Sequence, residues 1–505
     1  MRRFVFVSAL FAVLFPVIIH AQENLLLDYK FWQTATVESV VKVLDGGADI
    51  EARDDGGFTP LHWAAGHSET PEVISLLLDN GAKIEARNER KRTPLHVAVN
   101  ANNTPEVVEE LLKRNADIEV RDDGGFTPLH LAAGHSETPE VISLLLDNGA
   151  KIEALSKQNH TPLHFAAMSS NTPEVVKELL KRGANFKALS KQDQTPLHLA
   201  AWIGKLEIAS LLLNRGAKIE ARNKDGWTPL HSAAAAYNES PEVISLLLGE
   251  DADVEARDDG GFTPLHLAAG HSETPEVISL LLGEDADIEA RSKDGWTPLH
   301  WAAGHSETPE VISLLLYKGA DIKATDKDLW TPLHWAAHAA VRVVAGLDKM
   351  PEDISLFLGE DAGIGAEDEF ESVQVARVEA RLNKKLDTIS LLLDEGANVK
   401  FESREGQTPF DIVKGNEHLQ KTKVYWKLNE AQYRDDADTS NFNNSEINSL
   451  KEIVDAKIEV VKAQRDSLHA GFLEALIPVV GVAVAIVVGV IALLGVFIGY
   501  LHKKN

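Results

Sequence analysis

The chain contains no cysteine, which excludes disulfides, zinc sites built from thiolates and a cysteine nucleophile. Basic residues are also in short supply: 50 lysines and arginines stand against 77 aspartates and glutamates, a formal net charge of -27. Because a protein that binds nucleic acid needs a basic face for the phosphates, this balance argues against nucleic acid as a partner. It favours a basic protein partner instead. With 505 residues, the chain is too long for one ordinary globular core.

Long apolar runs are confined to the two ends of the chain. Residues 1–21, MRRFVFVSALFAVLFPVIIHA, have a basic start, a short apolar stretch and a small final residue, which is the layout of a cleavable secretory signal peptide. An uncleaved N-terminal anchor is the alternative. Residues 475–501 carry no charge and are long enough to cross a bilayer, and the basic tail at 502–505 is typical of a cytoplasmic flank. We therefore expect a single-pass membrane protein whose body is exported to a periplasmic, lumenal or extracellular side, with a cytoplasmic C-terminus.

Between these ends, the tetrapeptide Thr-Pro-Leu-His recurs nine times, with its threonine at 59, 93, 127, 161, 195, 228, 263, 297 and 331. A constant period of about 34 residues is typical of a solenoid of stacked units. The threonine can cap a first helix, and the proline occupies a first turn where its missing N–H costs nothing. A second run, such as Pro-Glu-Val-Ile-Ser-Leu-Leu-Leu at 71–78, predicts a second helix with one apolar side.

Thr-Pro-Leu-His-x-Ala-Ala, followed by an Ile-Ser-Leu-Leu-Leu helix and Gly-Ala, resembles the ankyrin repeat. The resemblance implies two antiparallel helices and a protruding β-hairpin finger per unit, with turns such as Asp-Asp-Gly-Gly at 54–57. We expect an all-α repeat solenoid of about twelve stacked helix-loop-helix units over residues 24–427. This array would comprise a degenerate first unit at 24–57, regular units at 58–365 and irregular units at 366–427. The chain also resembles ankyrin proteins of host-associated bacteria, which adds host proteins to the candidate partners.

The array is followed by three further segments. Residues 428–444 are polar and predict a linker, and residues 445–472 predict an amphipathic juxtamembrane helix. That helix could form a coiled-coil stalk, lie along the bilayer or pack on the last repeats. In the transmembrane segment, Gly495 and Gly499 have the G-x-x-x-G spacing that favours helix–helix contact, and hence a homodimer. An alternative function follows from this segment: a membrane-active protein whose Gly-rich helix oligomerises into a pore or translocation element.

The repeated polar residues predict structure rather than catalysis. Each histidine of the row from His62 to His334 belongs to a different unit, so these side chains cannot meet at one metal ion. The resemblance implies that this histidine bonds the loop backbone. Carboxylates repeat with the unit and indicate a solvated face, and neither a nucleophile elbow nor a phosphate-binding glycine loop is present. We predict no catalytic residue, no metal, no cofactor and no enzymatic activity.

Two columns of aromatic residues mark the candidate binding surface. The position before the threonine holds Phe58, Phe126, Trp227, Phe262, Trp296 and Trp330, and the position after the histidine holds Trp63, Trp301 and Trp335. In ankyrin arrays the fingers and first helices line a concave face that usually binds partners, and aromatic side chains are favoured anchors. The alternative is that they pack finger onto helix within the array. The basic finger containing Arg90 and Arg92 is a second candidate contact. The partner's identity does not follow from the sequence.

Overall fold

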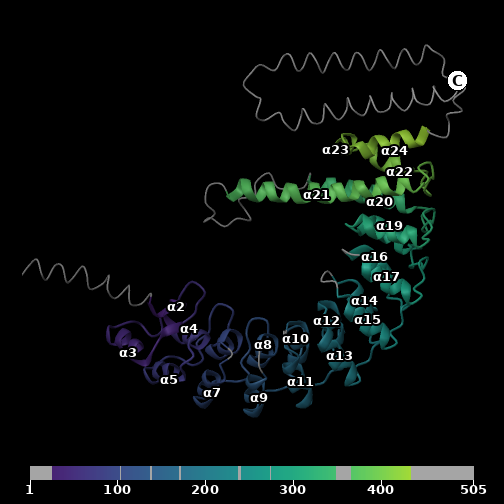
Figure 1. The fold of residues 1–505 in the computed structure, drawn as a ribbon. Coiled ribbons are helices and arrows are strands. Elements are labelled where there is room, and N and C mark those ends of the chain that lie inside the picture. Colours follow the sequence, from purple (N-terminus) through teal and green to yellow (C-terminus); the bar gives the residue numbers. More distant parts are fainter. Residues whose placement is uncertain are drawn as a thin grey trace, which may run out of the picture. The chain divides into compact units, whose positions relative to one another are not determined.

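The computed structural model describes residues 25–433, apart from 103, 137–138, 170–171, 237–239, 273–274 and 348–365 (Figure 1). The expected signal peptide, juxtamembrane helix, transmembrane segment with Gly495 and Gly499, and C-terminal tail lie outside the described residues, as does most of the linker. Among the helices that are described, none combines the length and apolarity that a membrane span requires.

The described chain is an array of helix pairs, as expected, and each pair contacts the next (Figure 1). The first helices lie side by side in one layer: α2 (Tyr29–Thr34), α4 (Pro60–His67), α6 (Pro94–Val97) with the π-helix η1 (Ala98–Asn102), α8 (Pro128–His135), α10 (Pro162–Ser169), α12 (Pro196–Ile203), α14 (Pro229–Ala234), α16 (Pro264–His271), α18 (Pro298–His305), α20 (Pro332–Leu347) and α22 (Pro409–Val413). The second helices form the other layer: α3 (Val37–Asp45), α5 (Pro71–Asp79), α7 (Pro105–Lys113), α9 (Glu140–Asp147), α11 (Pro173–Lys181), α13 (Leu206–Asn214), α15 (Pro241–Gly249), α17 (Pro275–Gly283), α19 (Pro309–Tyr317) and α21 (Ala366–Asp394). Two helices follow α22: α23 (Glu417–Gln420) and α24 (Lys423–Tyr433).

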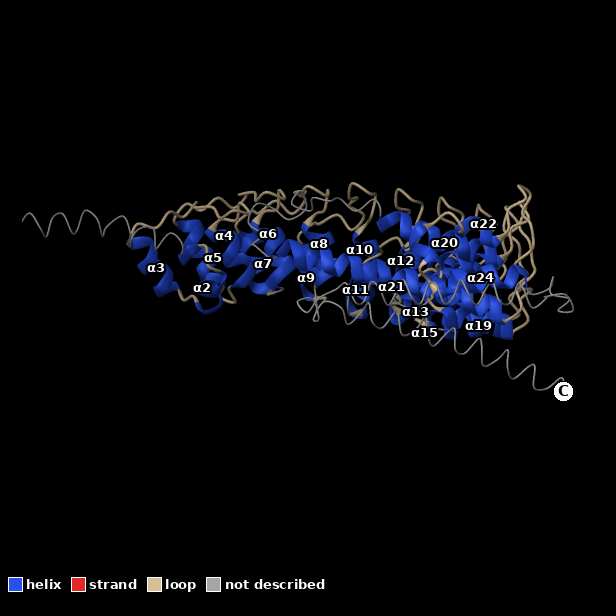
Figure 2. Ribbon diagram, turned by 90° about the horizontal axis from the view of Figure 1, so that it is seen from above, coloured by secondary structure: helices blue, strands red, loops and turns tan. Residues whose placement is uncertain are grey.

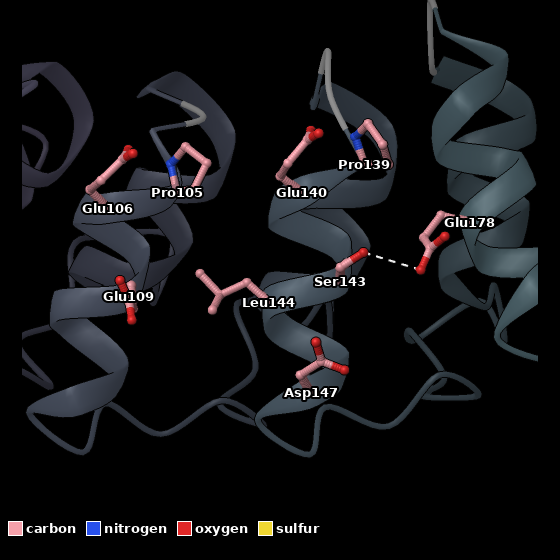
Figure 3. A pocket seen from close by; sticks show the side chains of 9 residues that line it. All are labelled: Pro105, Glu106, Glu109, Pro139, Glu140, Ser143, Leu144, Asp147 and Glu178. Carbon is pink, nitrogen blue, oxygen red and sulfur yellow. Dashed lines mark hydrogen bonds between the residues drawn. The ribbon is translucent and has the colours of Figure 1, made fainter.

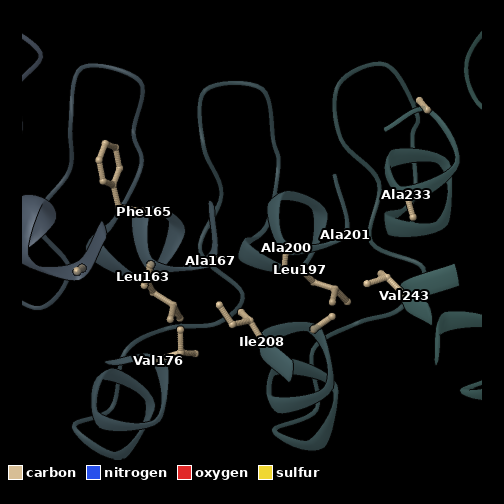
Figure 4. Close-up of a cluster of buried hydrophobic side chains, with 14 of the residues drawn as sticks. Leu163, Phe165, Ala167, Val176, Leu197, Ala200, Ala201, Ile208, Ala233 and Val243 are labelled. Atoms are coloured by element: carbon tan, nitrogen blue, oxygen red, sulfur yellow. The ribbon is translucent and has the colours of Figure 1, made fainter. Parts of the chain in front are cut away.

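The repeated residues build these elements in the way the pattern predicts. Thr59 forms a capping box with His62 at the start of α4, and Pro60 occupies the first turn. Apolar side chains from both layers then meet between the helices and are excluded from water, as Leu163, Val176, Leu197 and Ile208 illustrate (Figure 4). Because every unit covers the core of its neighbour, the array has one continuous core rather than a series of separate ones.

The fingers are tight turns and not the β-hairpins that we expected. In the first regular finger, the Asp54 carboxylate accepts the N–H groups of Gly56 and Phe58 at 2.9 Å each, and Gly57 takes a left-handed conformation (φ +73°). Neighbouring fingers are joined by bonds such as Glu89 N–H to the Gly56 carbonyl at 3.0 Å. Within the finger, the Asp54 N–H to Phe58 carbonyl bond and the Gly57 N–H to Asp54 carbonyl bond close a turn without continuing into a ladder, and the described residues include no strand (Figure 2).

The irregular end of the array also differs from expectation. The imidazole Nε2 of His334 bonds the carbonyl of Gln407, 73 residues away, whereas the equivalent histidines bond a carbonyl 29–31 residues away. Since α21 contacts both α19 and α20, its C-terminal part serves as the second helix of the unit that begins at Thr331. Residues 366–399 therefore do not form a separate unit, and the described array has ten helix pairs followed by α22, α23 and α24, rather than about twelve pairs. The 16-residue α20 and the 29-residue α21 are both much longer than their counterparts.

Candidate functional site

The nine motif histidines have the structural role that the repeat predicts. In the unit of His300, the backbone N–H of Thr297 donates to Nδ1 at 3.2 Å, and Nε2 lies 2.9 Å from the carbonyl of Trp330 in the next finger. Because Nδ1 accepts a backbone N–H, the proton belongs on Nε2, which donates to that carbonyl. Burial lowers the pKa of His300 to about 4, so the ring is neutral at pH 7. Each histidine thus ties its helix to the next finger.

The predicted aromatic residues between Trp296 and Trp335 form one continuous cluster with Phe262. The ring of Trp301 lies 4.6 Å from that of Phe262 and 5.2 Å from that of Trp296, and the rings of Trp296 and Trp335 are 4.2 Å apart. Trp330 continues the row, with its ring 4.9 Å from that of Trp335. We call these five residues the aromatic ladder. All five are half-buried, so they pack finger onto helix and also present part of each ring to solvent.

The other aromatic candidates form separate local groups. Phe58 packs on Trp63 with their rings 5.1 Å apart, and Phe126 packs on Phe165 at 4.6 Å. Trp227 lies 6.3 Å from Trp202 and donates its indole N–H to Asp258. Phe58, Trp63, Phe126 and Trp227 are likewise half-buried, but they are distributed along the array and do not join the aromatic ladder.

The two candidates in the basic finger differ from each other. Arg90 is exposed. Arg92 is half-buried and forms an ion pair at 3.2 Å with Asp122, whose side chain is almost fully buried in the next finger. Arg92 therefore holds two fingers together, and Arg90 is the one available for a partner.

One buried indole N–H in the aromatic ladder, that of Trp301, lacks an acceptor among the described residues. Trp63 and Trp335 donate their N–H groups to Asp54 and Asp326, each nine residues earlier in the same unit, at 3.0 and 2.9 Å. The corresponding residue for Trp301 is Ser292, and the buried indole N–H of Trp301 has no partner among the described residues. An unpaired buried donor costs about 1–3 kcal/mol, so this unit contains a defect that its two counterparts do not have.

Replacing Ser292 with aspartate should repair that defect. As in the Asp326 finger, one carboxylate oxygen would accept the finger N–H groups and the other the indole N–H of Trp301. We expect S292D to raise the free energy of unfolding by about 1–2 kcal/mol, measured by urea unfolding at pH 7.5 with circular dichroism. The matched control is S156D, because the side chain that would face the new carboxylate is Phe165, which has no N–H to donate. Equal effects of the two substitutions would contradict the explanation.

Sequence patterns did not reveal the cluster of basic side chains beside the aromatic ladder. Arg381 and Lys384 of α21 lie 2.7 and 3.7 Å from Glu307, in the loop after α18. The buried Lys385 donates to the carbonyls of Gly304 and Ser306 at 3.3 and 2.5 Å, and burial lowers its pKa to about 8. The long interval between Thr331 and the next regular finger was the only sign of this insertion.

On the opposite layer, α7, α9 and α11 border a shallow acidic hollow of about 370 Å³ (Figure 3). Several of its carboxylates are already paired: Glu178 bonds Arg182 at 2.8 Å and Ser143 at 3.1 Å, and Glu109 bonds Lys113 at 2.9 Å. This arrangement serves the contact between successive second helices. Within residues 25–433 as described, no three histidine, aspartate or glutamate side chains gather as a metal site would require.

Comparison with known proteins agrees with this architecture. The family model for ankyrin repeats (3 copies) matches in overlapping windows from 33–122 to 265–356, which together cover more than half of the chain. No curated protein matches the chain. Arrays of this kind are typically non-catalytic and act as protein–protein interaction scaffolds. The regular period, the paired helices and the family match together show that the chain belongs to the ankyrin-repeat family.

Proposed function

We propose that the protein is a scaffold that binds a protein partner on the face formed by its fingers and first helices, centred on the aromatic ladder. The observation that carries this proposal is the ladder itself, in which four indoles and a phenyl ring remain half-exposed along neighbouring units. Tryptophan is the residue most enriched among side chains that dominate binding energy. Elsewhere, most of the large hydrophobic side chains lie in the core.

Site-specific photocrosslinking in the cells that make the full chain tests this proposal. A photoreactive residue in place of Lys293, which is exposed on a finger beside the aromatic ladder, should capture a protein partner. The matched control is the same residue in place of Tyr317, which is 85% exposed but lies on the second-helix layer. Capture at Tyr317 without capture at Lys293 would overturn the proposal.

We further propose that the scaffold is exported and held by the C-terminal apolar segment, with homodimerisation through Gly495 and Gly499. Support comes from the sequence of the two ends alone. Protease protection on intact cells, with one tag after Gln22 and another after Asn505, tests this arrangement. If the envelope shields the array, partners are periplasmic or lumenal; if the array is cut on intact cells, host or neighbouring-cell proteins become candidates. Cytoplasmic behaviour of the array would contradict export.

A further inference from the structure

The extended helix α20 continues the aromatic ladder into a basic strip. Trp335, His338 and Arg342 follow one another at helical spacings of three and four, so they share one face of α20. The rings of Trp335 and His338 are 5.8 Å apart. The pKa of His338 is lowered mainly by burial and, to a smaller extent, by the positive charge of Arg342. The Arg342 guanidinium therefore lies near the His338 ring, on the same side of α20. Arg381 and Lys384 of the neighbouring α21 complete the strip at its far end.

This strip has the opposite charge to the rest of the array. Arg342 is exposed, and no carboxylate pairs with it among the described residues. Arg381 and Lys384 share one carboxylate, that of Glu307, and their side chains remain 59% and 50% exposed. In a chain with a net charge of -27, these three exposed cations, for which Glu307 is the one bonded carboxylate among the described residues, form a local concentration of positive charge.

The finger end of the strip is apolar. Leu329 occupies the fingertip position that holds glycine in five of the other regular fingers, and it takes the same left-handed conformation (φ +60°). A leucine there is strained by about 1 kcal/mol or more, and its side chain is 41% exposed. The finger end of the strip therefore presents a strained and partly exposed leucine to solvent. Trp330, the next residue, joins Leu329 to the aromatic ladder.

From this arrangement we propose that the strip from Leu329 to Lys384 binds an acidic segment of the partner protein. An apolar residue of that segment would contact Leu329 and Trp330, and its carboxylates would pair with Arg342, Arg381 and Lys384. The inference rests on the proposed scaffold function and specifies the partner's chemistry, which is opposite to the basic partner that the net charge alone favours. A nucleic acid is a poorer fit, because the surrounding acidic array repels a long polyanion.

Fluorescence anisotropy on the full chain, purified in mild detergent, tests the inference. The probe is a fluorescein-labelled peptide with one leucine followed by six glutamates, compared with the peptide bearing six lysines. We expect the acidic peptide to bind more tightly, and the double variant R342E/K384E to weaken it at least tenfold. The matched control is R90E/K91E, which reverses two exposed charges in the basic finger, away from the strip, and should change the dissociation constant less than twofold.

A second variant separates function from folding. L329G relieves the backbone strain, so it should raise the urea midpoint while weakening the leucine-containing acidic peptide severalfold. Preference for the lysine peptide, unchanged binding in R342E/K384E, or equal affinity for a single-stranded oligonucleotide with six phosphates would overturn the inference. The scaffold proposal would still stand if crosslinking at Lys293 succeeded, so the two can fail separately.

Discussion

Lowering the pH from 7.5 to 4.5 is expected to remove most of the folding stability of the array. In the unfolded chain, histidine titrates near pH 6.5, but in the folded array burial lowers the pKa of all nine motif histidines. For five of them the pKa falls to about 4: His96, His130, His164, His266 and His300. Below pH 6.5 the unfolded chain therefore binds more protons than the folded one, and stability is lost as the pH falls towards 4.

The magnitude follows from the number of such groups. Each of the five histidines should contribute about 1 kcal/mol of lost stability per pH unit between pH 6 and pH 4.5. Together they approach the 5–15 kcal/mol that is typical of a folded domain, so the effect should dominate over the surface ion pairs. Urea midpoints measured at pH 7.5, 6.5, 5.5 and 4.5 give the slope directly.

Two variants identify the groups responsible. H300Q removes one titrating ring while keeping an acceptor for Thr297 and a donor for the Trp330 carbonyl, so it should flatten the pH dependence by about one histidine's share. H418Q, at an exposed histidine outside the repeat motif, is the matched control for the effect of a histidine-to-glutamine substitution itself. Urea midpoints that stay constant from pH 7.5 to 5 would contradict the assignment.

Local chemistry explains why so much of the fold followed from the sequence. The motif that starts at Thr59 contains its own helix cap, first-turn proline and buried leucine, so each unit is specified within a few residues and then repeated. The bond from His62 to the next finger follows from the same repetition, since every unit meets a nearly identical neighbour. Local sequence rules, applied to one unit and repeated along the array, are therefore enough to predict the regular units.

The departures have longer-range causes. A second-helix pattern begins at Pro351 and another ends at Leu393, and local pattern alone does not decide which one completes the unit of Thr331. In the described structure the later pattern, at the end of α21, supplies the second helix of this unit. The contacts that fix this choice join residues more than 70 positions apart in the sequence, such as His334 and Gln407. The same closure brings Arg381 and Lys384 to Glu307, which is why the basic strip could not be predicted. The finger geometry was also mispredicted, because the backbone bonds of each finger close a turn and do not extend into a pair of strands.

Replacing Gly270 with alanine should destabilise the array, whereas the same change at Gly304 should not. Both glycines lie near the end of a first helix and face the tryptophan of the next unit. A methyl group at Gly270 would overlap the indole nitrogen and Cδ1 of Trp301, whereas at Gly304 the nearest Trp335 atom would be 3.8 Å away, an ordinary contact. Alanine's better helix propensity, about 1 kcal/mol, applies to both sites, so urea unfolding should separate the variants by the overlap cost of about 1–3 kcal/mol.

The cause of that difference can be tested by coupling it to Ser292. Trp335 is held away from Gly304 by its bond to Asp326, whereas Trp301 lacks such an acceptor and leans on Gly270. In the S292D background the indole should turn to the new carboxylate, and G270A should then cost clearly less than it does in the wild type. A double-mutant cycle between the two positions measures this as a coupling energy of about 1 kcal/mol or more. Additive effects would show that the packing of Trp301 against Gly270 does not depend on the missing aspartate.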